Sequence, residues 1–272
     1  MILDGAVLGN EIKKEVQKEV EHLKSKGIIP ALRCLVSSDD KSTRVYLNSI
    51  KRNCDKLGIN YAEVETDSKN IIKDVKTLNE DDKVHGVMLM HPVPKGVDEI
   101  SVLSTLDPKK DVEGRTPENL GKILLNAPFF VPCTAQAVVE LLEYHNVPLK
   151  GANVTIVGRS TTVGKPLSLL LMSRNATVTV CHSKTQNLIE KTKHADVLVV
   201  AIGKPKMFDE KWVKKGAVVI DVGINVVNGK VIGDVDFDSV SKKASVSKVP
   251  GGVGSITNAV LMRNIVRSAR GI

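Results

Sequence analysis

The first half of the chain alternates between segments with helical periodicity and short, continuous apolar runs. Ile12, Val16, Val20 and Leu23 recur on one helical face, and Gly27 then provides a helix stop. Helices alternating with buried strands indicate βαβ units and a parallel sheet. The expected elements here are helices over 10–27 and 43–57 and strands over 32–36, 60–64 and 86–90.

The same alternation restarts after Pro148 and Gly151 and predicts a second domain. Its expected elements are strands over 154–157, 177–181, 197–202 and 217–222, and helices over 164–173 and 186–194. A helix over 134–145 leads into this domain, and a last helix over 257–269 follows it. We therefore predict an α/β protein with two doubly wound α/β domains, the second being a Rossmann-type nucleotide-binding domain. We expect residues 1–137 and 256–272 to form the first domain, with the C-terminal helix returning to it across 253–257, and 138–255 to form the second.

Length and cysteine content narrow the class of protein. The 272 residues suffice for two domains with separate cores. The chain has no apolar run of about 18 residues and lacks the basic-then-apolar start of a secretory signal. Cys34, Cys54, Cys133 and Cys181 form no C-x-x-C pair, so we expect neither a metal site nor disulfides. A reducing, cytoplasmic location fits this pattern best.

The net charge of +8 raises the question of nucleic-acid binding. Lysines are scattered and often adjoin acidic residues, and aromatic residues make up only 3% of the chain. Nucleic-acid binding would call for a concentrated basic stripe or stacking aromatic side chains. We therefore expect solvated helix faces, neither nucleic acid nor membrane as a partner, and some attraction for a polyanionic small molecule.

A glycine turn between an expected strand and an expected helix is the sharpest local signal. Gly158, Arg159 and Ser160 follow the strand over 154–157, and the helix begins near Gly164. A helix N-terminus presents free N–H groups and a positive dipole end to a phosphate, and glycine allows close approach of the backbone. The spacing is not the usual G-x-G-x-x-G, so the turn indicates a dinucleotide site and also fits a tight turn without a ligand.

The end of the next strand distinguishes the two nicotinamide cofactors. NAD enzymes typically place an acid there to bind the ribose 2′-hydroxyl. This chain has His182, Ser183, Lys184 and Thr185 instead. Because Ser183 and Arg159 can hold a 2′-phosphate that an acid would repel, the pattern favours NADP.

Six short stretches in order resemble the methylenetetrahydrofolate dehydrogenase/methenyltetrahydrofolate cyclohydrolase family. The resemblance runs from about residue 3 to residue 269, and it implies a folate-binding first domain, an NADP-binding second domain and a homodimer. It also implies hydride transfer from 5,10-methylenetetrahydrofolate to NADP, followed by hydrolysis of the methenyl product to 10-formyltetrahydrofolate. The stretches are Asp111-Val112-Glu113-Gly114, Pro132-Cys133-Thr134, Gly158-Arg159-Ser160, Cys181-His182-Ser183-Lys184-Thr185, Asp221-Val222-Gly223-Ile224 and 249–254.

The resemblance assigns roles by position. Tyr46 matches the tyrosine that stacks on the folate, Ser183 the 2′-phosphate contact and Ile224 the nicotinamide-side contact. The expected cofactor-binding set is Gly158, Arg159, Ser160, Gly164, Ser183, Thr185 and Ile224. The expected substrate-binding set is Tyr46, Met90, His91, Pro92, Glu113, Pro250, Gly251 and Gly252. Tyr46, Lys51 and Glu113 are the expected catalytic residues.

Three departures from the family pattern concern the hydrolytic step. The family has Y-x-x-x-K on the helix of Tyr46, where the lysine handles protons, and this chain has Ile50 at the lysine position. Lys51 is adjacent, but one helical residue turns it by about 100°. The family's Q-L-P-L-P becomes 90–94, with Met90 replacing the glutamine, and its D-V-D-G carries Glu113. We expect clear dehydrogenase activity and weak cyclohydrolase activity, with Lys51, His91 or Glu113 as candidates for the missing base.

Two other readings remain open at this stage. An NADP-dependent dehydrogenase of a small hydroxy acid, such as shikimate, has a similar size and plan, and would use a Lys/Asp pair such as Lys51 and Asp111. A non-catalytic module that binds NADP or folate would explain the lost lysine as decay, although the nucleotide and substrate loops are intact.

Overall fold

The computed structural model describes residues 1–38 and 40–271 and divides into two compact units. Unit 1 comprises Met1–Asn10 and Pro132–Thr257, and unit 2 comprises Glu11–Val131 and Asn258–Ile272. Both units are parallel α/β structures, so the fold class expected from the sequence is confirmed.

Unit 1 is built on a six-stranded, wholly parallel sheet in the order β1-β11-β8-β7-β5-β6. Strands β7 and β8 are continuous apolar runs that are buried on both faces, as central parallel strands usually are. The strands are β1 (Ile2–Leu3), β5 (Asn153–Val157), β6 (Thr177–Cys181), β7 (Val197–Val200), β8 (Val218–Asp221) and β11 (Ser245–Ser247). The helices are α6 (Cys133–Tyr144), α7 (Gly164–Met172), α8 (Leu188–Lys193), α9 (Phe237–Val240) and the 3-10 helix Glu210–Trp212.

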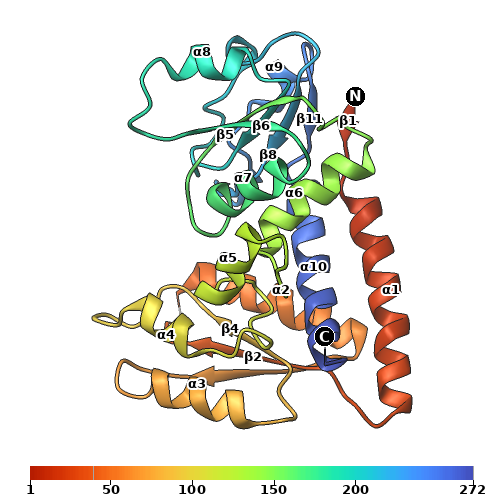
Figure 1. Cartoon of the computed structure of the whole chain (residues 1–272), viewed down its shortest axis with the longest axis vertical. Helices are drawn as coiled ribbons and strands as arrows, with labels where there is room; N and C mark the ends of the chain where they lie inside the picture. The colour runs from red at the N-terminus through yellow and green to blue at the C-terminus, as the bar shows by residue number, and fades with distance from the viewer. Residues whose placement is uncertain (39, 272) are drawn as a thin grey trace. The chain divides into compact units, whose positions relative to one another are not determined.

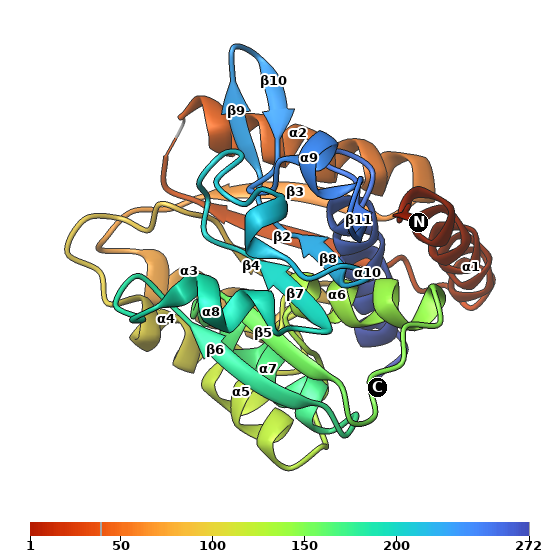
Figure 2. The same cartoon turned by 90° about the horizontal axis from the view of Figure 1, so that it is seen from above.

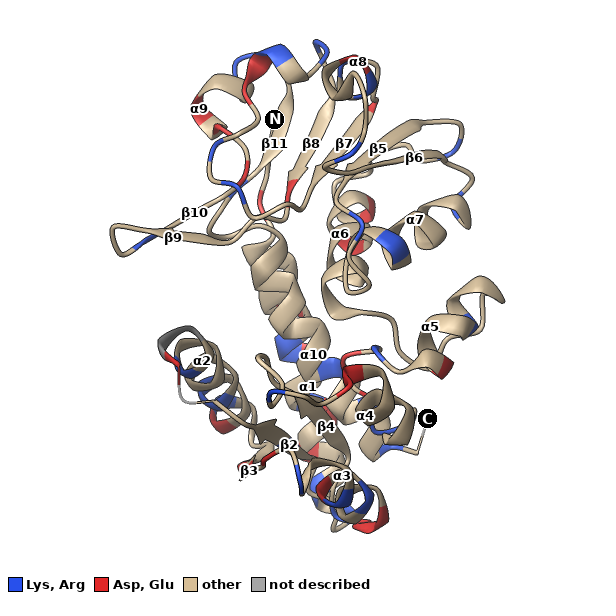
Figure 3. Cartoon of the chain, turned by 90° about the vertical axis from the view of Figure 1, so that its left-hand side faces the viewer, with Lys and Arg blue, Asp and Glu red and all other residues tan. Residues whose placement is uncertain are grey.

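A separate hairpin extends from unit 1 (Figures 2 and 3). It consists of β9 (Asn225–Val227) and β10 (Lys230–Ile232), paired antiparallel. Asn228 and Gly229 connect them with positive φ angles of 51° and 74°. This is the conformation that an Asn-Gly turn favours. The Asn-Gly pair could therefore have predicted this hairpin, which is not among the elements expected from the sequence.

Unit 2 contains a three-stranded parallel sheet in the order β3-β2-β4 (Figure 1). Leu35, Ile71, Val87 and Val102 belong to one apolar cluster that joins the sheet to α3 and α4. On α2, the Cys54 sulfur lies 3.8 Å from the Met262 sulfur on α10. The elements are α1 (Ala6–Ser25), β2 (Ala31–Val36), α2 (Lys41–Leu57), β3 (Asn60–Glu65), α3 (Ile71–Glu80), β4 (Gly86–Leu89), α4 (Glu99–Thr105), α5 (Pro117–Leu124) and α10 (Val253–Ala269).

Three expected boundaries differ from the structure, and one of them is that residues 132–137, expected in the first domain, belong to unit 1. Residues 1–10 were expected in the first domain, but β1 pairs in parallel with β11, so they belong to unit 1. The expected crossing segment 253–257 is already helical, because Val253, Ile256 and Val260 are buried at helical spacing on α10. The division between the units therefore falls inside α10, after Thr257, and the part of that helix from Asn258 onward belongs to unit 2.

Charged side chains are distributed as the sequence suggested. Figure 3 shows basic and acidic residues interspersed along α2 and α3. Within the described residues, none of the helices combines the length and the apolar character required to cross a membrane.

Candidate active site

A pocket of about 240 Å³ lies in unit 2 where β4 ends. It collects side chains from the first turns of α2, from the loop after β4 and from the loop between α4 and α5. Four of the residues expected to bind or transform the substrate are therefore neighbours. The lining residues are Thr43, Tyr46, Leu89, Met90, His91, Glu113 and Arg115.

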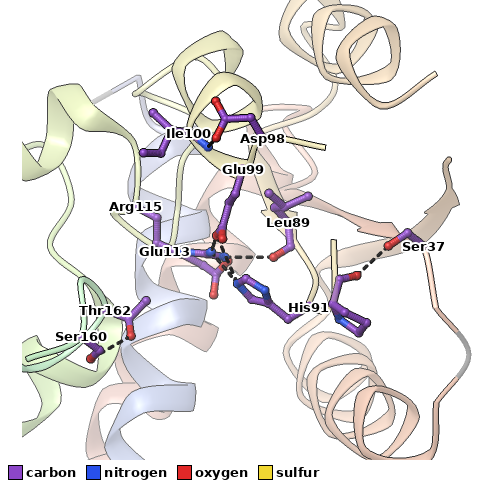
Figure 4. A network of polar contacts seen from close by, with 11 residues as sticks. Ser37, Leu89, His91, Asp98, Glu99, Ile100, Glu113, Arg115, Ser160 and Thr162 are labelled. Carbon is purple, nitrogen blue, oxygen red and sulfur yellow. Dashed lines mark hydrogen bonds and ion pairs between the residues drawn. The ribbon is translucent and has the colours of Figure 1, made fainter. Parts of the chain in front are cut away.

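Hydrogen bonds from neighbouring elements fix the loop after β4. The Thr43 hydroxyl donates to the backbone oxygen of His91 at 2.8 Å. The Ser37 hydroxyl donates to the backbone oxygen of Pro92 at 2.7 Å (Figure 4). The backbone N–H of Met90 donates to the Leu35 oxygen at 3.0 Å, which continues the sheet register into the loop. The pocket wall at 90–92 is therefore held from both β2 and α2.

Asp111 organises the opposite wall. Its side chain is 1% exposed and accepts hydrogen bonds from the Thr116 backbone N–H at 2.7 Å and from Asn119 Nδ2 at 2.9 Å. Gly114, with φ of 69°, turns the chain between Glu113 and Arg115. A buried carboxylate with two donors stabilises such a turn, because both lone-pair directions are satisfied. Glu113 and Arg115 are thereby directed to the same pocket.

The guanidinium group of Arg115 connects the polar groups of the pocket (Figure 4). Its Nη1 donates to the Leu89 backbone oxygen at 3.0 Å and lies 3.4 Å from Glu113 Oε2. Its Nη2 lies 2.7 Å from His91 Nε2 and also contacts the Glu99 carboxylate. Only 9% of the Arg115 side chain is exposed, so this network has little competition from water.

Burial dominates the electrostatics of Glu113. The desolvated position of its carboxyl group raises the pKa above the usual value, and the adjacent Arg115 opposes that rise. The carboxyl group therefore retains its proton to a higher pH than an exposed glutamate does, and it can donate as well as accept a hydrogen bond.

The other two positions that depart from the family pattern, 50 and 90, have distinct environments. Ile50 is fully buried on α2, one turn after Tyr46, which is 38% exposed. Lys51 is exposed and is not among the described residues that line the pocket. Met90 lines the pocket although only 6% of it is exposed, and its thioether cannot donate a hydrogen bond. No side chain at positions 50 and 90 can handle a proton here.

The glycine turn of unit 1 has tight internal packing. Gly158 has a φ of 134°, and a Cβ there would lie 2.4 Å from the Ala201 backbone oxygen. A Cβ on Gly164 would lie 2.0 Å from the Gly158 oxygen. The Ser160 hydroxyl accepts a hydrogen bond from the Val163 backbone N–H at 3.1 Å. The turn therefore requires glycine at both positions, and it leaves the side chains of Arg159 and Ser160 exposed.

The turn after β6 lies beside this loop in the sheet. The Gly158 N–H donates to the Cys181 oxygen at 2.9 Å, so the two strand ends are adjacent. The Thr185 hydroxyl accepts from the His182 backbone N–H at 2.8 Å, which closes the turn and leaves Ser183 exposed. Guanidinium and hydroxyl donors at adjacent strand ends suit a phosphate, because both form hydrogen bonds to its oxygens.

Two buried carboxylates support the loops on either side of Ile224. Asp221 accepts from the backbone N–H groups of Gly223 and Asp234, both at 2.9 Å, and Val235 at 3.0 Å. Burial raises the pKa of Asp221 to about 6 in spite of these donors. Asp234 is also fully buried. The side chain of Ile224 is 67% exposed. The two buried carboxylates therefore hold the segment from which this apolar side chain extends into solvent.

Pro250, Gly251 and Gly252, which the family resemblance assigns to the substrate, belong to unit 1. The Gly5 N–H donates to the Gly251 oxygen at 2.9 Å, and a Cβ on Gly5 would lie 2.4 Å from the Gly252 oxygen. The N-terminal segment therefore packs directly against this loop.

Sequence reasoning missed several residues that shape these sites. Arg115 and Glu99 gave no signal, because an isolated charged residue in a loop or at a helix start usually indicates solvated surface. Asp234 was also missed, although Asp221 belongs to one of the six stretches that resemble the family. The available signal for Asp234 was its place directly after Gly233 and shortly after the Asn228-Gly229 turn.

Comparison with known proteins gives matches along nearly the whole chain. The model of the tetrahydrofolate dehydrogenase/cyclohydrolase catalytic domain matches residues 3–113, and the model of the tetrahydrofolate dehydrogenase/cyclohydrolase NAD(P)-binding domain matches residues 132–271. The bifunctional protein FolD of Thermodesulfovibrio yellowstonii is 46% identical over 275 residues, covering 99% of this chain and 96% of the relative.

Solved structures agree with these matches. The bifunctional enzyme FolD, a methylenetetrahydrofolate dehydrogenase/cyclohydrolase from Campylobacter jejuni, aligns with a TM-score of 0.96 at 37% identity and covers 100% of this chain and 99% of its own. The Trypanosoma brucei enzyme, solved with NADP cofactor and an inhibitor, aligns with a TM-score of 0.94 at 32% identity, covering 100% of this chain and 97% of its own.

Proposed function

This chain belongs to the tetrahydrofolate dehydrogenase/cyclohydrolase family, and we propose that it oxidises 5,10-methylenetetrahydrofolate with NADP and hydrolyses the methenyl product only weakly. The observation that carries the proposal is the pocket of unit 2, which keeps Tyr46 and a carboxylate at Glu113 but has neither the lysine nor the glutamine of the family pattern.

Unit 1 supplies the cofactor side of the reaction. Arg159 and Ser183 follow adjacent strand ends and are exposed, and no acid stands at the end of β6 to repel a 2′-phosphate. The match to the NAD(P)-binding domain model and the relative solved with NADP support NADP as the cofactor. When bound, the nicotinamide accepts the hydride. The chain's own contribution is to hold the dinucleotide at Gly158–Ser160 and to offer the apolar Ile224 beside the ring.

Unit 2 with its pocket is proposed to bind the folate. The Tyr46 ring is large, partly exposed and suited to stacking on a planar pteridine. Glu113 and Arg115 offer a carboxyl group and fixed donors to the polar edge of such a ring. Hydride transfer requires mainly that the two ligands are held in reach of each other, so it does not depend on a lysine at position 50.

The hydrolytic half-reaction has a further requirement. Water that attacks the methenyl carbon must lose a proton, and a positioned acid or base contributes roughly 10²–10⁴-fold to such a step. Ile50 has no group that can transfer a proton. Lys51 is exposed and is not one of the described residues that line the pocket. We therefore expect a rate of hydrolysis well below the rate of dehydrogenation.

The test measures both reactions with one preparation. Absorbance at 340 nm follows NADPH formation from methylenetetrahydrofolate and NADP, and the decay of the methenyl absorbance, corrected for buffer hydrolysis, follows the second step. We expect clear NADP reduction, little reduction of NAD, and slow enzyme-dependent methenyl decay. Absence of NADP reduction under these conditions would refute the proposal.

The hydroxy-acid alternative lacks support. Its proton transfer would need Lys51 and Asp111 as a pair, but Lys51 is exposed, whereas Asp111 is buried and already accepts hydrogen bonds from Thr116 and Asn119. A non-catalytic binding module is disfavoured by the coverage of both domain models. Shikimate offered with NADP should give no absorbance change at 340 nm.

We also propose a homodimer formed through the β9–β10 hairpin. Val226 is 72% exposed, and Val227 and Val231 also have exposed side chains. Such a group of apolar side chains on a projecting element is typical of an interaction surface. Light scattering should give twice the chain mass, and Val226→Lys should shift the equilibrium toward the monomer.

A cytoplasmic location is proposed from the cysteines. Cys34, Cys54, Cys133 and Cys181 are all buried, and none of them forms a disulfide within the described residues. Cysteines without disulfides fit a reducing compartment. Fractionation of the native cells should place the protein with cytoplasmic markers.

A further inference from the structure

We propose that His91 is the proton-transfer group for the remaining hydrolysis of the methenyl product, at the step for which the family uses a lysine. The inference rests on the proposed function, since it concerns the same pocket and the same folate. It assigns a catalytic role to a residue that the family pattern does not contain, because the pattern has leucine at the position of His91.

The first argument is a comparison of the groups in the pocket. Tyr46, His91 and Glu113 are the lining side chains that can exchange a proton, since Arg115 stays charged. A phenol releases its proton only near pH 10. The Glu113 side chain is 22% exposed, and its carboxyl group lies against the charged Arg115. Imidazole is the side chain that exchanges a proton most readily near neutral pH, and 55% of the His91 side chain is exposed.

The second argument is the position of the ring between a donor and an acceptor. His91 Nε2 lies 2.7 Å from Arg115 Nη2 and 3.2 Å from Glu99 Oε1 (Figure 4). Arg115 can only donate, so it stabilises the tautomer in which Nε2 is unprotonated and Nδ1 carries the proton. Glu99 accepts, so it stabilises the tautomer in which Nε2 carries the proton and Nδ1 is unprotonated.

Both tautomers therefore have a partner at the same nitrogen. With Glu99 as the partner, Nδ1 is a base, and with Arg115 as the partner, Nδ1 is a hydrogen-bond donor. A group that first takes a proton and later returns it alternates between neutral imidazole and imidazolium. The tautomer whose Nε2–H is donated to Glu99 is therefore the one that can take the proton of water at Nδ1, and the Glu99 carboxylate stabilises the resulting cation. The charged and titratable groups that face the ring are Arg115 from the loop before α5, Glu99 from α4, and Glu113 and Tyr46 across the pocket.

The third argument is that the ring is anchored. The backbone oxygen of His91 accepts a hydrogen bond from the Thr43 hydroxyl, and the next residue, Pro92, is bound to Ser37. The side chain therefore extends from a loop held on both sides, which a catalytic group requires in order to keep its geometry.

The proposed step balances as follows. Water forms a C–O bond to the methenyl carbon and gives one proton to His91, which produces a neutral carbinolamine. The carbinolamine then loses its hydroxyl proton to solvent as the C=O bond forms. The C–N5 bond breaks, and His91 returns its proton to N5. The net change is one water consumed and one proton released, with no oxidation or reduction.

The experiment follows methenyl decay with the wild type, His91→Ala and His22→Ala across pH 5.5 to 8.5, each with and without imidazole. His22 is exposed on α1 and does not line the pocket, so it serves as the matched control. We expect His91→Ala to lose about 100-fold of the enzyme-dependent decay and its pH dependence. Added imidazole should restore part of the decay in His91→Ala and have no such effect in His22→Ala.

Three results would overturn the assignment: no enzyme-dependent decay in the wild type, an unchanged rate or pH profile in His91→Ala, or failure of imidazole to restore any decay. NADP reduction is measured in the same samples. If the wild type reduces NADP but one of these results is found, His91 is excluded and the proposed dehydrogenase stands. If the wild type does not reduce NADP, the proposed function itself fails.

Discussion

The buried carboxylate of Asp221 accepts a hydrogen bond from the backbone N–H of Asp234 at 2.9 Å, which joins the end of β8 to the chain that returns from the β9–β10 hairpin. Asp234 in turn accepts from the backbone N–H groups of Ile202 and Gly203, at 2.7 and 2.9 Å, in the loop after β7. The two carboxylates thus connect loops at two neighbouring strand ends. Ile224 lies on the segment between them, so its position depends on this pair.

We expect Asp234→Ala to impair both stability and cofactor binding. The substitution leaves the N–H groups of Ile202, Gly203 and Lys204 without their acceptor. Because these donors lose charge-assisted hydrogen bonds to a carboxylate that is itself fully buried, the free energy of unfolding should fall by more than about 3 kcal/mol. The KM for NADP should rise more than kcat falls, since the loop that flanks the nicotinamide contact loses its anchor.

Asp238→Ala is the matched control, because Asp238 is an exposed acid four residues further along. Its change in the free energy of unfolding should stay within about 0.5 kcal/mol. Urea unfolding and steady-state kinetics check both variants. Equal effects of the two substitutions would show that the loop does not depend on the Asp234 carboxylate.

Asp221 should produce a pH-dependent difference in stability. Burial raises the pKa of the Asp221 carboxyl group in the folded protein from its ordinary value of 3.8 to about 6. The folded state therefore binds the proton more tightly, and this contribution to stability is present at low pH and is lost as the pH rises from about 4 to 6. Asp221→Asn has no such titration, so its destabilisation should be about 2 kcal/mol smaller at pH 7.5 than at pH 4.5.

Asp196→Asn provides a control, because the pKa shift of Asp196 has the opposite sign. The hydrogen bond from Lys214, together with that from the Asn153 N–H, lowers the pKa of Asp196. The stability that this carboxylate contributes is lost only as the pH falls below about 4, which is the opposite direction to Asp221, so the effect of its removal should be nearly the same at pH 7.5 and pH 4.5. The measurement is the urea unfolding midpoint of the wild type and of both variants at the two pH values. A pH-independent effect of Asp221→Asn would contradict the interpretation.

Much of the fold could be predicted from the sequence, because the central strands are continuous apolar runs between helices with clear periodicity. Strand β1 could not be, since Ile2–Leu3 is too short to carry a pattern and its partner is the distant β11. The start of α10 could not be predicted because glycines at 251, 252 and 254 favour a loop. The segment is helical from Val253 because Val253 and Ile256 are buried. Strand β1 and the start of α10 thus depend on long-range pairing and burial, which the local sequence pattern does not contain.

The candidate site was predictable in a different way. Tyr46, His91 and Glu113 came from aligned motifs, and they do line one pocket. Arg115 could not be predicted, because its contacts with Leu89, His91 and Glu99 exist only after separate loops meet. Sequence spacing gives the order of such residues along the chain, but the network forms only in three dimensions.

Arg159→Ala should narrow the preference for NADP over NAD. The substitution removes a charge-assisted contact to a 2′-phosphate worth about 1.5–3 kcal/mol, so kcat/KM with NADP should fall by roughly 10- to 100-fold. Values with NAD should change little, since NAD lacks that phosphate. Lys150→Ala is the control, because Lys150 is an exposed cation at the opposite end of β5. Efficient use of NAD by the wild type would contradict the interpretation that the absence of an acid at the end of β6 selects NADP.

Ile50→Lys should increase hydrolysis at the expense of stability. A side chain at position 50 lies one helical turn after Tyr46, so a lysine there is on the same face of α2. Because Ile50 is fully buried, an ammonium group in its place should cost about 3 kcal/mol of folding free energy. Enzyme-dependent methenyl decay should nevertheless rise at least about tenfold relative to NADP reduction, since the lysine supplies a proton-transfer group to the pocket.

Ile50→Met separates the chemistry from the change in packing, because methionine is flexible and apolar and cannot transfer a proton. It should lose less stability than Ile50→Lys and leave the ratio of the two activities at the wild-type value. Both rates are divided by the folded fraction, measured by circular dichroism at the assay temperature, so that unfolding does not conceal a gain. If Ile50→Lys and Ile50→Met then hydrolyse the methenyl compound equally slowly, the missing lysine is not what limits the second reaction, and the limit must lie in how Met90 and the loop after β4 hold the substrate.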